Sequence, residues 1–570
     1  MKTRCQPALA LIVCLLATCC TSILSAQKNE AQKNEAQKKE AQENGREKLD
    51  RAMLAKLSAR SFAQRDQVIQ LARAAVDAGL AGDDLKFANF LIAAALTERA
   101  TILSRDAFDR PQISPQWQKI RQQAILDLIR AIKADRSIAQ SHFLLGRYLA
   151  QRGGDRKRAI AAFDEAIRLD EDNQSVRARA LVYRANLRTD AKKRLSDYNE
   201  AIELAPGDAL AIRSRGVFYL SQKKLDEAQA DLKAALVLDE NDDESHMAFG
   251  LAQMFGGKFV EARKSFDRVI ELTPEATMAY VHRARCNALT GNNEAALADV
   301  GKAIALSPTN LAALMLRARL LASRGDVRLA RADVDRVLKL APNSTGALML
   351  RASIKANEKD NKGAIADVEA ALRIRPDDVD GLLRAALLYT ILKRSDKAVD
   401  TYSQVIRLAP DRWTAYRGRG DAYLGMGRQA KAVADYAAAL KIDPKQPGVL
   451  NNLAWVLSTS PDEKLRDGAR AIELAEKACD LTDFKQAHII STLAAGYAET
   501  GDFDNAVKWS KRAIEVGDAS LKGPLRKELA SYLEKKPWRE LKKQDRDAVS
   551  DGDRNEKDDS AKSDRDGVKR

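Results

Sequence analysis

The feature that most constrains this chain is a proline that returns every 34 residues. The regular series consists of Pro274, Pro308, Pro342, Pro376, Pro410 and Pro444. Continued backwards in the same phase, the series passes Glu240 and reaches Pro206. A period of this length indicates an internal repeat, so the length of 570 residues says little about the number of domains.

Each repeat reads as two helices joined by a turn. With the proline numbered as position 32, small or apolar residues fall at positions 4, 8, 11, 20, 24 and 27, a helical spacing within each half. The proline ends the second helix, because it cannot continue a helix and disfavours helical angles in the residue before it. A glycine at position 15 is expected to end the first helix in the left-handed conformation. The repeats supply it as Gly257, Gly291, Gly325, Gly427 and Gly501.

This period, the helix pair, the small residues at positions 8 and 20 and the closing proline resemble the tetratricopeptide repeat (TPR) family. The run from Asn451 to Trp509 is similar to the terminal segment of large exported bacterial members. The resemblance implies an all-α superhelical solenoid (α-α superhelix). One helix pair cannot bury its own apolar face, so neighbouring pairs must stack on each other.

Pattern and composition divide the chain into six segments. We predict a signal peptide at 1–26, a charged low-complexity spacer at 27–46, a helical cap of diverged repeats at 47–138, an array of about eleven repeats at 139–520, a C-terminal capping helix at 521–540 and a disordered charged tail at 541–570. Within the cap, the pattern predicts helices over 62–81, 85–104 and 117–134.

The first 26 residues have the features of a secretory signal. Lys2 and Arg4 give a positive start, residues 9–17 are apolar, and Ala26 ends an acceptable cleavage site. Export to the periplasm or cell envelope is therefore predicted. Two alternatives stay open: an uncleaved anchor, and lipid attachment at Cys19, which follows a sequence similar to a lipobox. Contact with a membrane is expected only through such an anchor.

Composition argues against nucleic acid and against catalysis. The formal charge is +15, but basic and acidic residues alternate, and nucleic-acid binding needs a concentrated basic face. No signature of a metal site, nucleotide site or activated nucleophile occurs, and the four histidines lie in different repeats. We predict no enzyme activity, no cofactor and no metal site. Outside residues 1–26, Cys286 and Cys479 lie several repeats apart, so a disulfide between them is not expected.

Arginine at position 7 and aspartate at position 23 occur together in five of the seven repeats that end at or after Glu240. The five pairs are Arg215 with Asp231, Arg283 with Asp299, Arg317 with Asp333, Arg351 with Asp367, and Arg419 with Asp435. The other two repeats lack both residues, having Phe249 with Ser265 and Ala385 with Thr401. We predict a partly buried ion pair between the two helices, because arginine on a packed face needs a carboxylate. The alternative that both are solvated and were inherited by repeat duplication stays open.

The resemblance implies that positions 2, 5, 9, 12 and 13 of each first helix line an inner groove. The apolar residues at these positions include Met247, Met254, Phe255, Met278, Val281, Met315, Met349 and Leu383, and the basic ones are Arg213, Arg285, Arg319 and Arg417. Methionine suits a surface that adapts to a peptide or helix. The alternative is that the methionines pack between neighbouring first helices. The Lys and Asn pair with which some family members hold a peptide C-terminus is not matched.

These patterns predict a non-catalytic scaffold or assembly factor of the cell envelope that binds a protein or peptide partner in the groove. Two alternatives are a membrane-tethered lipoprotein of an outer-membrane or secretion assembly, and an enzyme or enzyme subunit with a site in 47–138.

Overall fold

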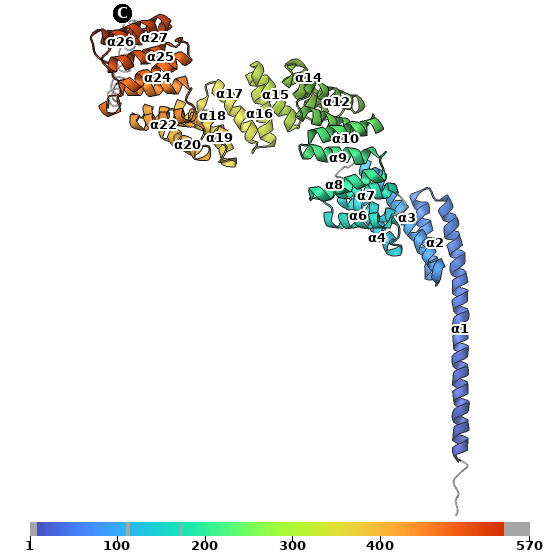
Figure 1. Ribbon diagram of the computed structural model, residues 1–570. Helices are drawn as coiled ribbons and strands as arrows, with labels where there is room; N and C mark the ends of the chain where they lie inside the picture. The colour runs from blue at the N-terminus through green and yellow to red at the C-terminus, as the bar shows by residue number, and fades with distance from the viewer. Residues whose placement is uncertain (1–7, 110–114, 171–173, 541–570) are drawn as a thin grey trace, which may run out of the picture. The chain divides into compact units, whose positions relative to one another are not determined.

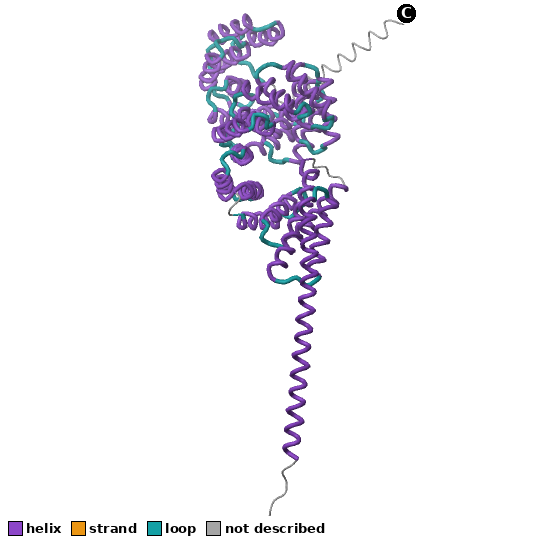
Figure 2. Tube along the Cα trace, turned by 90° about the vertical axis from the view of Figure 1, so that its right-hand side faces the viewer, coloured by secondary structure: helices purple, strands orange, loops and turns teal. Residues whose placement is uncertain are grey.

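The computed structural model describes the backbone of residues 8–109, 115–170 and 174–540, and the side chains of residues 27–104, 117–170 and 174–540. In these ranges the regular structure is α-helical apart from one short 3-10 helix, and no strand is formed (Figure 2). The chain divides into two compact units, Met1–Asn292 and Asn293–Arg570. The predicted all-α fold is confirmed.

The first unit holds thirteen helices in its described residues, which succeed one another along the chain (Figure 1). They are α1 (Ala8–Ser58), α2 (Phe62–Asp77), α3 (Gly82–Asp109), α4 (Pro115–Ala134), α5 (Ala139–Ala150), α6 (Arg156–Leu169), α7 (Gln174–Leu187), α8 (Ala191–Leu204), α9 (Ala209–Ser221), α10 (Leu225–Leu238), α11 (Asp243–Phe255), α12 (Phe259–Leu272) and α13 (Thr277–Leu289).

The second unit continues the series with the helices that end the array. They are α14 (Asn293–Leu306), α15 (Leu311–Arg324), α16 (Val327–Leu340), α17 (Thr345–Asn357), α18 (Asn361–Ile374), α19 (Val379–Ile391), α20 (Ser395–Leu408), α21 (Trp413–Gly425), α22 (Gln429–Ile442), α23 (Pro447–Thr459), the 3-10 helix η1 (Glu463–Leu465), α24 (Gly468–Leu481), α25 (Ala487–Glu499), α26 (Phe503–Val516) and α27 (Ala519–Leu533).

The helices from α5 to α26 follow the predicted two-helix repeat. Each proline of the 34-residue series lies between the second helix of one repeat and the first helix of the next. Pro342, for example, falls between the end of α16 at Leu340 and the start of α17 at Thr345. The periodic prolines therefore separate repeats, as expected from their inability to continue a helix.

Position 15 has the left-handed conformation that the glycine pattern predicts. Gly257, Gly291, Gly325, Gly427 and Gly501 have φ angles of 77°, 82°, 94°, 73° and 85°. Three repeats carry lysine at the same position, and Lys223, Lys359 and Lys393 also have positive φ angles, of 60°, 65° and 56°. The turn therefore keeps its geometry even where the residue is poorly suited to it.

Small residues at position 8 let the two helices of a repeat approach closely. A Cβ atom added to Gly420 in α21 would lie 2.7 Å from Cε1 of Tyr436 in α22, which is itself fully buried. A Cβ atom on Gly250 in α11 would lie equally close, 2.7 Å, to Phe266 in α12. Each large ring of a second helix thus packs into the space that the missing side chain leaves.

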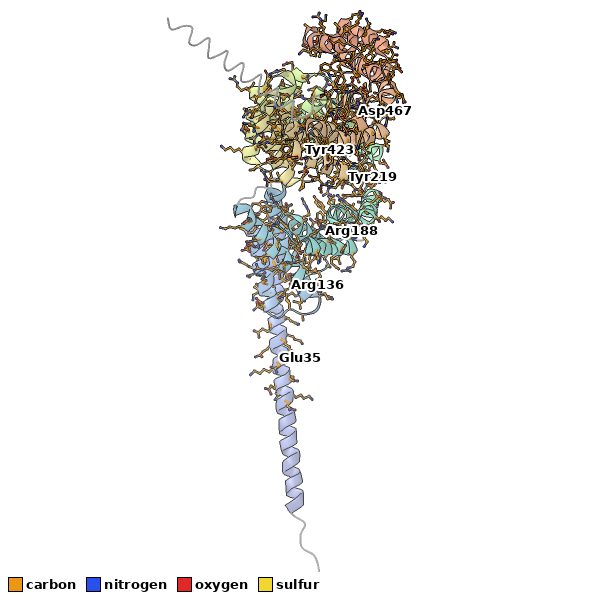
Figure 3. The ribbon with its side chains drawn as sticks, turned by 90° about the vertical axis from the view of Figure 1, so that its left-hand side faces the viewer. Glu35, Arg136, Arg188, Tyr219, Tyr423 and Asp467 are labelled. Carbon is orange, nitrogen blue, oxygen red and sulfur yellow. The ribbon has the colours of Figure 1, made fainter. Side chains whose placement is uncertain are left out.

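The N-terminal boundaries differ from the prediction. Residues 8–26 of the predicted signal peptide and the whole predicted spacer belong to one helix, α1. Residues 27–40 are exposed, and Glu35 lies on this projecting part (Figure 3). The spacer prediction is wrong at its end, because Gly45 is already buried and lies close to Leu80. The sequence repeat at 27–44 is helical because its Ala, Glu, Gln and Lys residues are good helix formers.

The cap forms two helix pairs, α1 with α2 and α3 with α4, close to the predicted helices. Ser61 and Gln64 form a capping box at the start of α2, in which each side chain bonds to the backbone of the other residue. Within the described parts of the chain, no helix combines the length and the apolar character that a membrane span needs.

At the other end, the capping helix α27 begins at Ala519 and ends at Leu533, whereas the prediction placed it at 521–540. The residues that follow return to α23. The backbone N–H of Glu540 donates to Thr459 O at 2.9 Å, and Arg539 donates to Ser458 O at 3.1 Å. The predicted tail, 541–570, lies outside the described residues.

Candidate partner-binding surface

In the second unit, position 5 of successive first helices forms a row on α15, α17, α19, α21 and α23. The row consists of Met315, Met349, Leu383, Arg417 and Asn451. The three apolar residues are half-buried, and Met349 and Leu383 also pack against the core around Ala386. Met349 and Leu383 therefore support the core and leave part of their surface exposed.

In the first unit, the predicted groove residues divide into two groups. Phe255 and Met278 are 62% and 40% exposed, and Met247 is half-buried. Met254 and Val281 are only 5% and 0% exposed, so the prediction that these two line a binding surface is wrong. Met254 packs in a buried cluster with Phe266 and Cys286, as the alternative of packing between helices proposed.

The predicted basic residues also differ among themselves. Arg285, Arg319 and Arg417 are exposed. Arg213 instead bonds to both carboxylate oxygens of Asp242 at 2.6 Å and also contacts Glu244 at 2.8 Å. Because these residues lie on or just before the next first helix, Arg213 ties α9 to α11 and is not a free groove cation.

A cavity of about 310 Å³ lies where the position-5 row ends, among α21, α23, α25 and α27. Leu424, Trp455 and Leu525 provide apolar wall, and Asn451 adds an amide. Asn451 is 9% exposed, and its Oδ1 atom accepts no hydrogen bond from the described residues. A buried acceptor without a donor is costly, so the cavity favours an occupant that carries an N–H or O–H group.

Burial shifts the pKa values of two ionisable groups of this cavity toward the uncharged form. Burial raises the pKa of Glu528 against the opposing hydrogen bond from Ser491, and Glu540 raises it further. Burial also lowers the pKa of His488, which favours the neutral imidazole. The cavity therefore suits a neutral polar or apolar group better than an ion.

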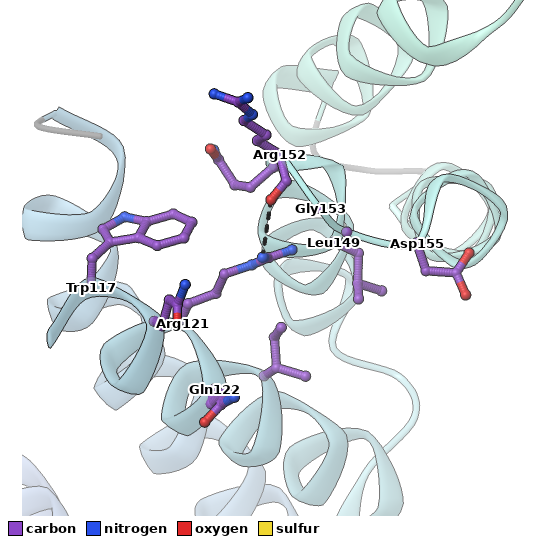
Figure 4. A pocket seen from close by; sticks show the side chains of 11 residues that line it. Trp117, Arg121, Gln122, Leu149, Arg152, Gly153 and Asp155 are labelled. Atoms are coloured by element: carbon purple, nitrogen blue, oxygen red, sulfur yellow. Dashed lines mark hydrogen bonds between the residues drawn. The ribbon is translucent and has the colours of Figure 1, made fainter. Parts of the chain in front are cut away.

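A larger cavity of about 800 Å³ lies between α4 and the α5–α6 turn (Figure 4). Arg121 crosses it, donating to Tyr148 O at 3.1 Å and to Arg152 O at 3.3 Å, with its guanidinium 5.5 Å from the Trp117 ring. Asp155, the carboxylate on the wall, accepts from the backbone N–H of Arg158 and caps α6. These groups have structural partners and do not form the nucleophile and base of a catalytic pair.

Four of the predicted arginine–aspartate pairs lie within one unit, and all four have two-point geometry. In each pair the arginine Nε and Nη2 atoms donate to the two carboxylate oxygens. The distances are 2.8 and 2.9 Å for Arg215 with Asp231, 2.7 Å twice for Arg317 with Asp333, 2.9 and 2.7 Å for Arg351 with Asp367, and 2.8 and 2.7 Å for Arg419 with Asp435. The members of the fifth pair, Arg283 and Asp299, belong to different units.

The structure adds a third partner that the sequence reading missed. The remaining Nη1 atom of the arginine donates to position 25 in the second helix of the preceding repeat. The acceptors are Asn199 for Arg215 at 2.9 Å, Asp267 for Arg283 at 2.7 Å, Asp335 for Arg351 at 2.8 Å and Ser403 for Arg419 at 2.9 Å. In the case of Arg215, Arg351 and Arg419, one side chain thus joins three helices across a repeat boundary. Arg317 is the exception, because Gly301 stands at position 25 before it.

Two further bridges of this kind lie in less regular repeats. Arg99 in α3 donates to both oxygens of Asp127 in α4 and to Asp66 in α2 at 2.8 Å. Arg184 in α7 donates to both oxygens of Asp197 in α8 and to Asp164 in α6 at 2.7 Å. Asp197 occupies position 23 counted back from Pro206, so the signal for the second bridge was present in the sequence.

Three further side chains with reactive groups are two cysteines and a histidine, and burial shifts the pKa of each toward its uncharged form. Burial raises the pKa of the Cys286 thiol to about 11 and that of Cys479 to about 12, so both stay in the unreactive thiol form. Burial lowers the pKa of His282 to about 4, and its ring stacks on Phe266. Among the described residues, no group of three or more His, Cys, Asp or Glu side chains is arranged to hold a metal ion.

The repeats of this chain are similar to those of known proteins. A family model described as Tetratricopeptide repeat matches residues 121–176, 247–310, 315–379 and 383–447. Superkiller complex protein 3 of Mus musculus is 27% identical over 185 residues, and Tetratricopeptide repeat protein 37 of Xenopus laevis is 25% identical over 194 residues. Each match covers 32% of this chain but spans only 12% of the relative's length.

Two solved structures align with parts of this chain at low identity. The C-terminal part of a TPR repeat-containing protein from Cytophaga hutchinsonii is 17% identical, with a TM-score of 0.38, over 43% of this chain and 99% of that one. Yeast Tom70 is 16% identical, with a TM-score of 0.31, over 77% of this chain and 95% of that one.

Proposed function

The chain is a tetratricopeptide repeat protein, and from that premise we propose that it is a scaffold that binds a partner peptide or helix along the first helices of its repeats. The observation that carries this proposal is the position-5 row of Met315, Met349 and Leu383. On three successive repeats an unbranched or flexible apolar side chain is left half-exposed beside exposed arginines. Such a surface can adapt its shape to an amphipathic partner.

The direction of the row supports an extended or helical partner. The row continues through Arg417 to Asn451, where the cavity of about 310 Å³ lies. An occupant with one apolar side chain and one N–H group matches that cavity, because the walls are apolar and the Asn451 Oδ1 atom lacks a donor. Apolar contacts along the row and a hydrogen bond at its end would give both affinity and register.

The test is site-specific photocrosslinking in the native host, with the crosslinker placed at Met315 and Met349. Matched controls carry it at Leu340 and Ile374, which end the second helices α16 and α18 and are 46% and 41% exposed. We expect defined partner adducts from the first pair, and loss of these adducts when Asn451 is changed to Leu. Equal labelling from both pairs, or labelling from the control pair alone, contradicts the proposal.

We further propose that the scaffold works in the cell envelope after export through residues 1–26, since the charge and apolar pattern of that segment is typical of a signal peptide. Mass spectrometry of the mature N-terminus distinguishes the alternatives. Cleavage leaves Gln27 first, a lipoprotein begins at an acylated Cys19, and an uncleaved anchor keeps Met1 or its successor. The last two outcomes would favour a membrane-tethered assembly component.

The enzyme alternative for residues 47–138 has less support. Among the described residues of this region, the buried ionisable side chains are Arg99 and Asp127, which bond to each other across α3 and α4. This arrangement repeats the ion pairs of the array, so it has a structural explanation that needs no substrate.

A further inference from the structure

The repeat formed by α19 and α20 keeps most of the surroundings of the bridging arginine but not the arginine itself. Ala385 stands at position 7 and Thr401 at position 23, where five other repeats have the arginine and the aspartate. A cavity of about 420 Å³ opens at this place, and both Ala385 and Thr401 line it. The cavity therefore occupies the space that a bridging arginine fills elsewhere.

Two features that contact the guanidinium in other repeats are retained around this cavity. Tyr389 lies at position 11, the position of Tyr219 and Tyr423, whose rings lie 6.0 Å from the guanidinium carbons of Arg215 and Arg419. Glu369 lies at position 25 of the preceding repeat, the position that accepts the arginine Nη1 bond. Both residues line the cavity.

The second repeat without arginine has changed these partners as well. In α11 and α12, position 11 is Gln253, which is buried and accepts from Ser265 at 2.7 Å. Position 25 before it is Lys233, which would repel a guanidinium. That repeat therefore lacks the arginine and also the aromatic ring and the acceptor that would contact it. Around α19 the carboxylate and the aromatic ring are present.

We propose that the cavity between α18, α19 and α20 receives an arginine side chain of a partner protein, which takes the place of the missing position-7 residue. The carboxylate of Glu369 pairs with the guanidinium, and the ring of Tyr389 flanks it. The Tyr389 hydroxyl donates to Glu369 Oε1 at 2.6 Å and so fixes the carboxylate in position.

The charges around the cavity affect its affinity for an arginine side chain. Arg373 is exposed at the rim, and the Lys397 ammonium lies 5.5 Å from the Tyr389 ring. These cations weaken the attraction, and aspartate at position 23 is absent, so a single arginine is expected to bind weakly. Changing Arg373 to Ala should strengthen binding.

The experiment uses the full chain with methyl-labelled alanine and leucine, titrated with N-acetyl-arginine methylamide. The matched ligand is the citrulline analogue, which has the same shape without the charge. We expect a saturable shift of the Ala385 and Leu382 signals with the arginine probe, with about tenfold weaker binding for citrulline and about fivefold weaker binding in Glu369→Gln. The Ala385→Arg/Thr401→Asp variant fills the cavity and should lose the response.

A positive control comes from the neighbouring repeat, where Arg351→Ala creates a comparable space beside Asp335 and Asp367. If the probe binds this variant but gives no saturable shift in the native cavity, the proposal is overturned. Equal binding of arginine and citrulline, or an unchanged affinity in Glu369→Gln, also overturns it. Should the filled variant fail to fold, the Glu369→Gln comparison still decides.

This site is independent of the position-5 row that carries the proposed function. Asn451→Leu should abolish the photocrosslinked adducts from Met315 and Met349 without changing the arginine titration. The two proposals can therefore fail separately.

Discussion

Two adjacent repeats of the second unit show how one backbone accommodates two different interiors. In α17 and α18, Arg351 and Asp367 join the helices by charge, whereas in α19 and α20 Ala385 and Thr401 stand in their place. Both repeats have a left-handed lysine at position 15, small residues at the helix crossing and a closing proline. The fold therefore depends on the turn and the small residues, and the ion pair is an addition to it.

The ion pair also contributes a link between repeats. Asp367 binds Arg351 within one repeat, but the Arg351 Nη1 bond to Asp335 reaches the preceding one. In a repeat array, stability is approximately the sum of the stabilities of single repeats and of their interfaces. Arginine repeats should therefore have stronger interfaces than the α19–α20 repeat.

The largest expected effect comes from removing one member of the pair. Arg351→Ala leaves Asp367, whose side chain is 7% exposed, with Lys355 as its remaining cation. Because the Arg351 side chain is itself 24% exposed, we expect the free energy of unfolding to fall by about 1 to 3 kcal/mol, less than for breaking a fully buried pair. Urea unfolding followed by circular dichroism, with hydrogen exchange in α17 and α18, measures it.

The double variant Arg351→Ala/Asp367→Thr provides the control, because it places in α17 and α18 the alanine and threonine that the following repeat has at positions 7 and 23. It should lower the free energy of unfolding less than Arg351→Ala alone, because no buried carboxylate is left without its partner. A double variant that loses as much as the two single variants together would show that the side chains are not coupled.

Acid should weaken the arginine repeat more than its neighbour. Burial raises the pKa of Asp367, but the hydrogen bonds from Arg351 and Lys355 outweigh it and hold the pKa below its usual value. A carboxyl with a depressed folded-state pKa stabilises fully above the unfolded value of about 3.9 and loses that contribution as the pH falls through the folded value. The stability difference between wild type and Arg351→Ala/Asp367→Thr should therefore shrink from pH 6 to pH 2. A constant difference would contradict the depressed pKa.

The sequence predicted the repeat and the pair more completely than the surfaces. Proline and glycine act locally, so their period predicted where helices end. The coincidence of arginine with aspartate predicted which helices are joined, because an unpaired arginine is costly at a packed position. The third partner at position 25 was missed because asparagine, aspartate or serine can accept the arginine's hydrogen bond there. No single residue type therefore recurs at that position in the sequence.

The binding surface was predicted less well for a physical reason. Methionine is compatible with both core and surface, so Met254 and Met278 look alike in sequence although one is 5% and the other 40% exposed. Arg213 likewise looked like a groove cation, but its partner Asp242 comes from the next helix pair. Such outcomes depend on the packing of neighbouring repeats, which a pattern within one repeat does not contain.

Replacing the left-handed lysine at position 15 by glycine should have a smaller effect, and the gain in stability should be the same in both repeats. Lys359 and Lys393 hold φ angles of 65° and 56°, which glycine adopts without strain. Lys359→Gly and Lys393→Gly should each raise stability by about 0.5 to 1 kcal/mol, measured by thermal unfolding. Gly325→Lys, at the same position in α15–α16, should lower it. Unequal gains would mean that the ion pair also affects the turn.

The smallest effect tests whether the link between repeats can be completed where it is absent. Arg317 binds Asp333, but Gly301 offers no side chain to its Nη1 atom, and the Arg317 side chain is 31% exposed against 24% for Arg351. A Cβ atom at Gly301 meets nothing within 4 Å, so substitution is sterically free. Gly301→Ala should stabilise through helix propensity alone, whereas Gly301→Asp gains less from propensity and should gain a few tenths of a kcal/mol from the new bond, about as much as a surface ion pair. Thermal unfolding in the Arg317→Ala background separates the two terms, because only the contribution of the bond to the stability difference between the Asp and Ala variants requires the guanidinium. If that difference is the same with and without Arg317, position 25 does not link the repeats.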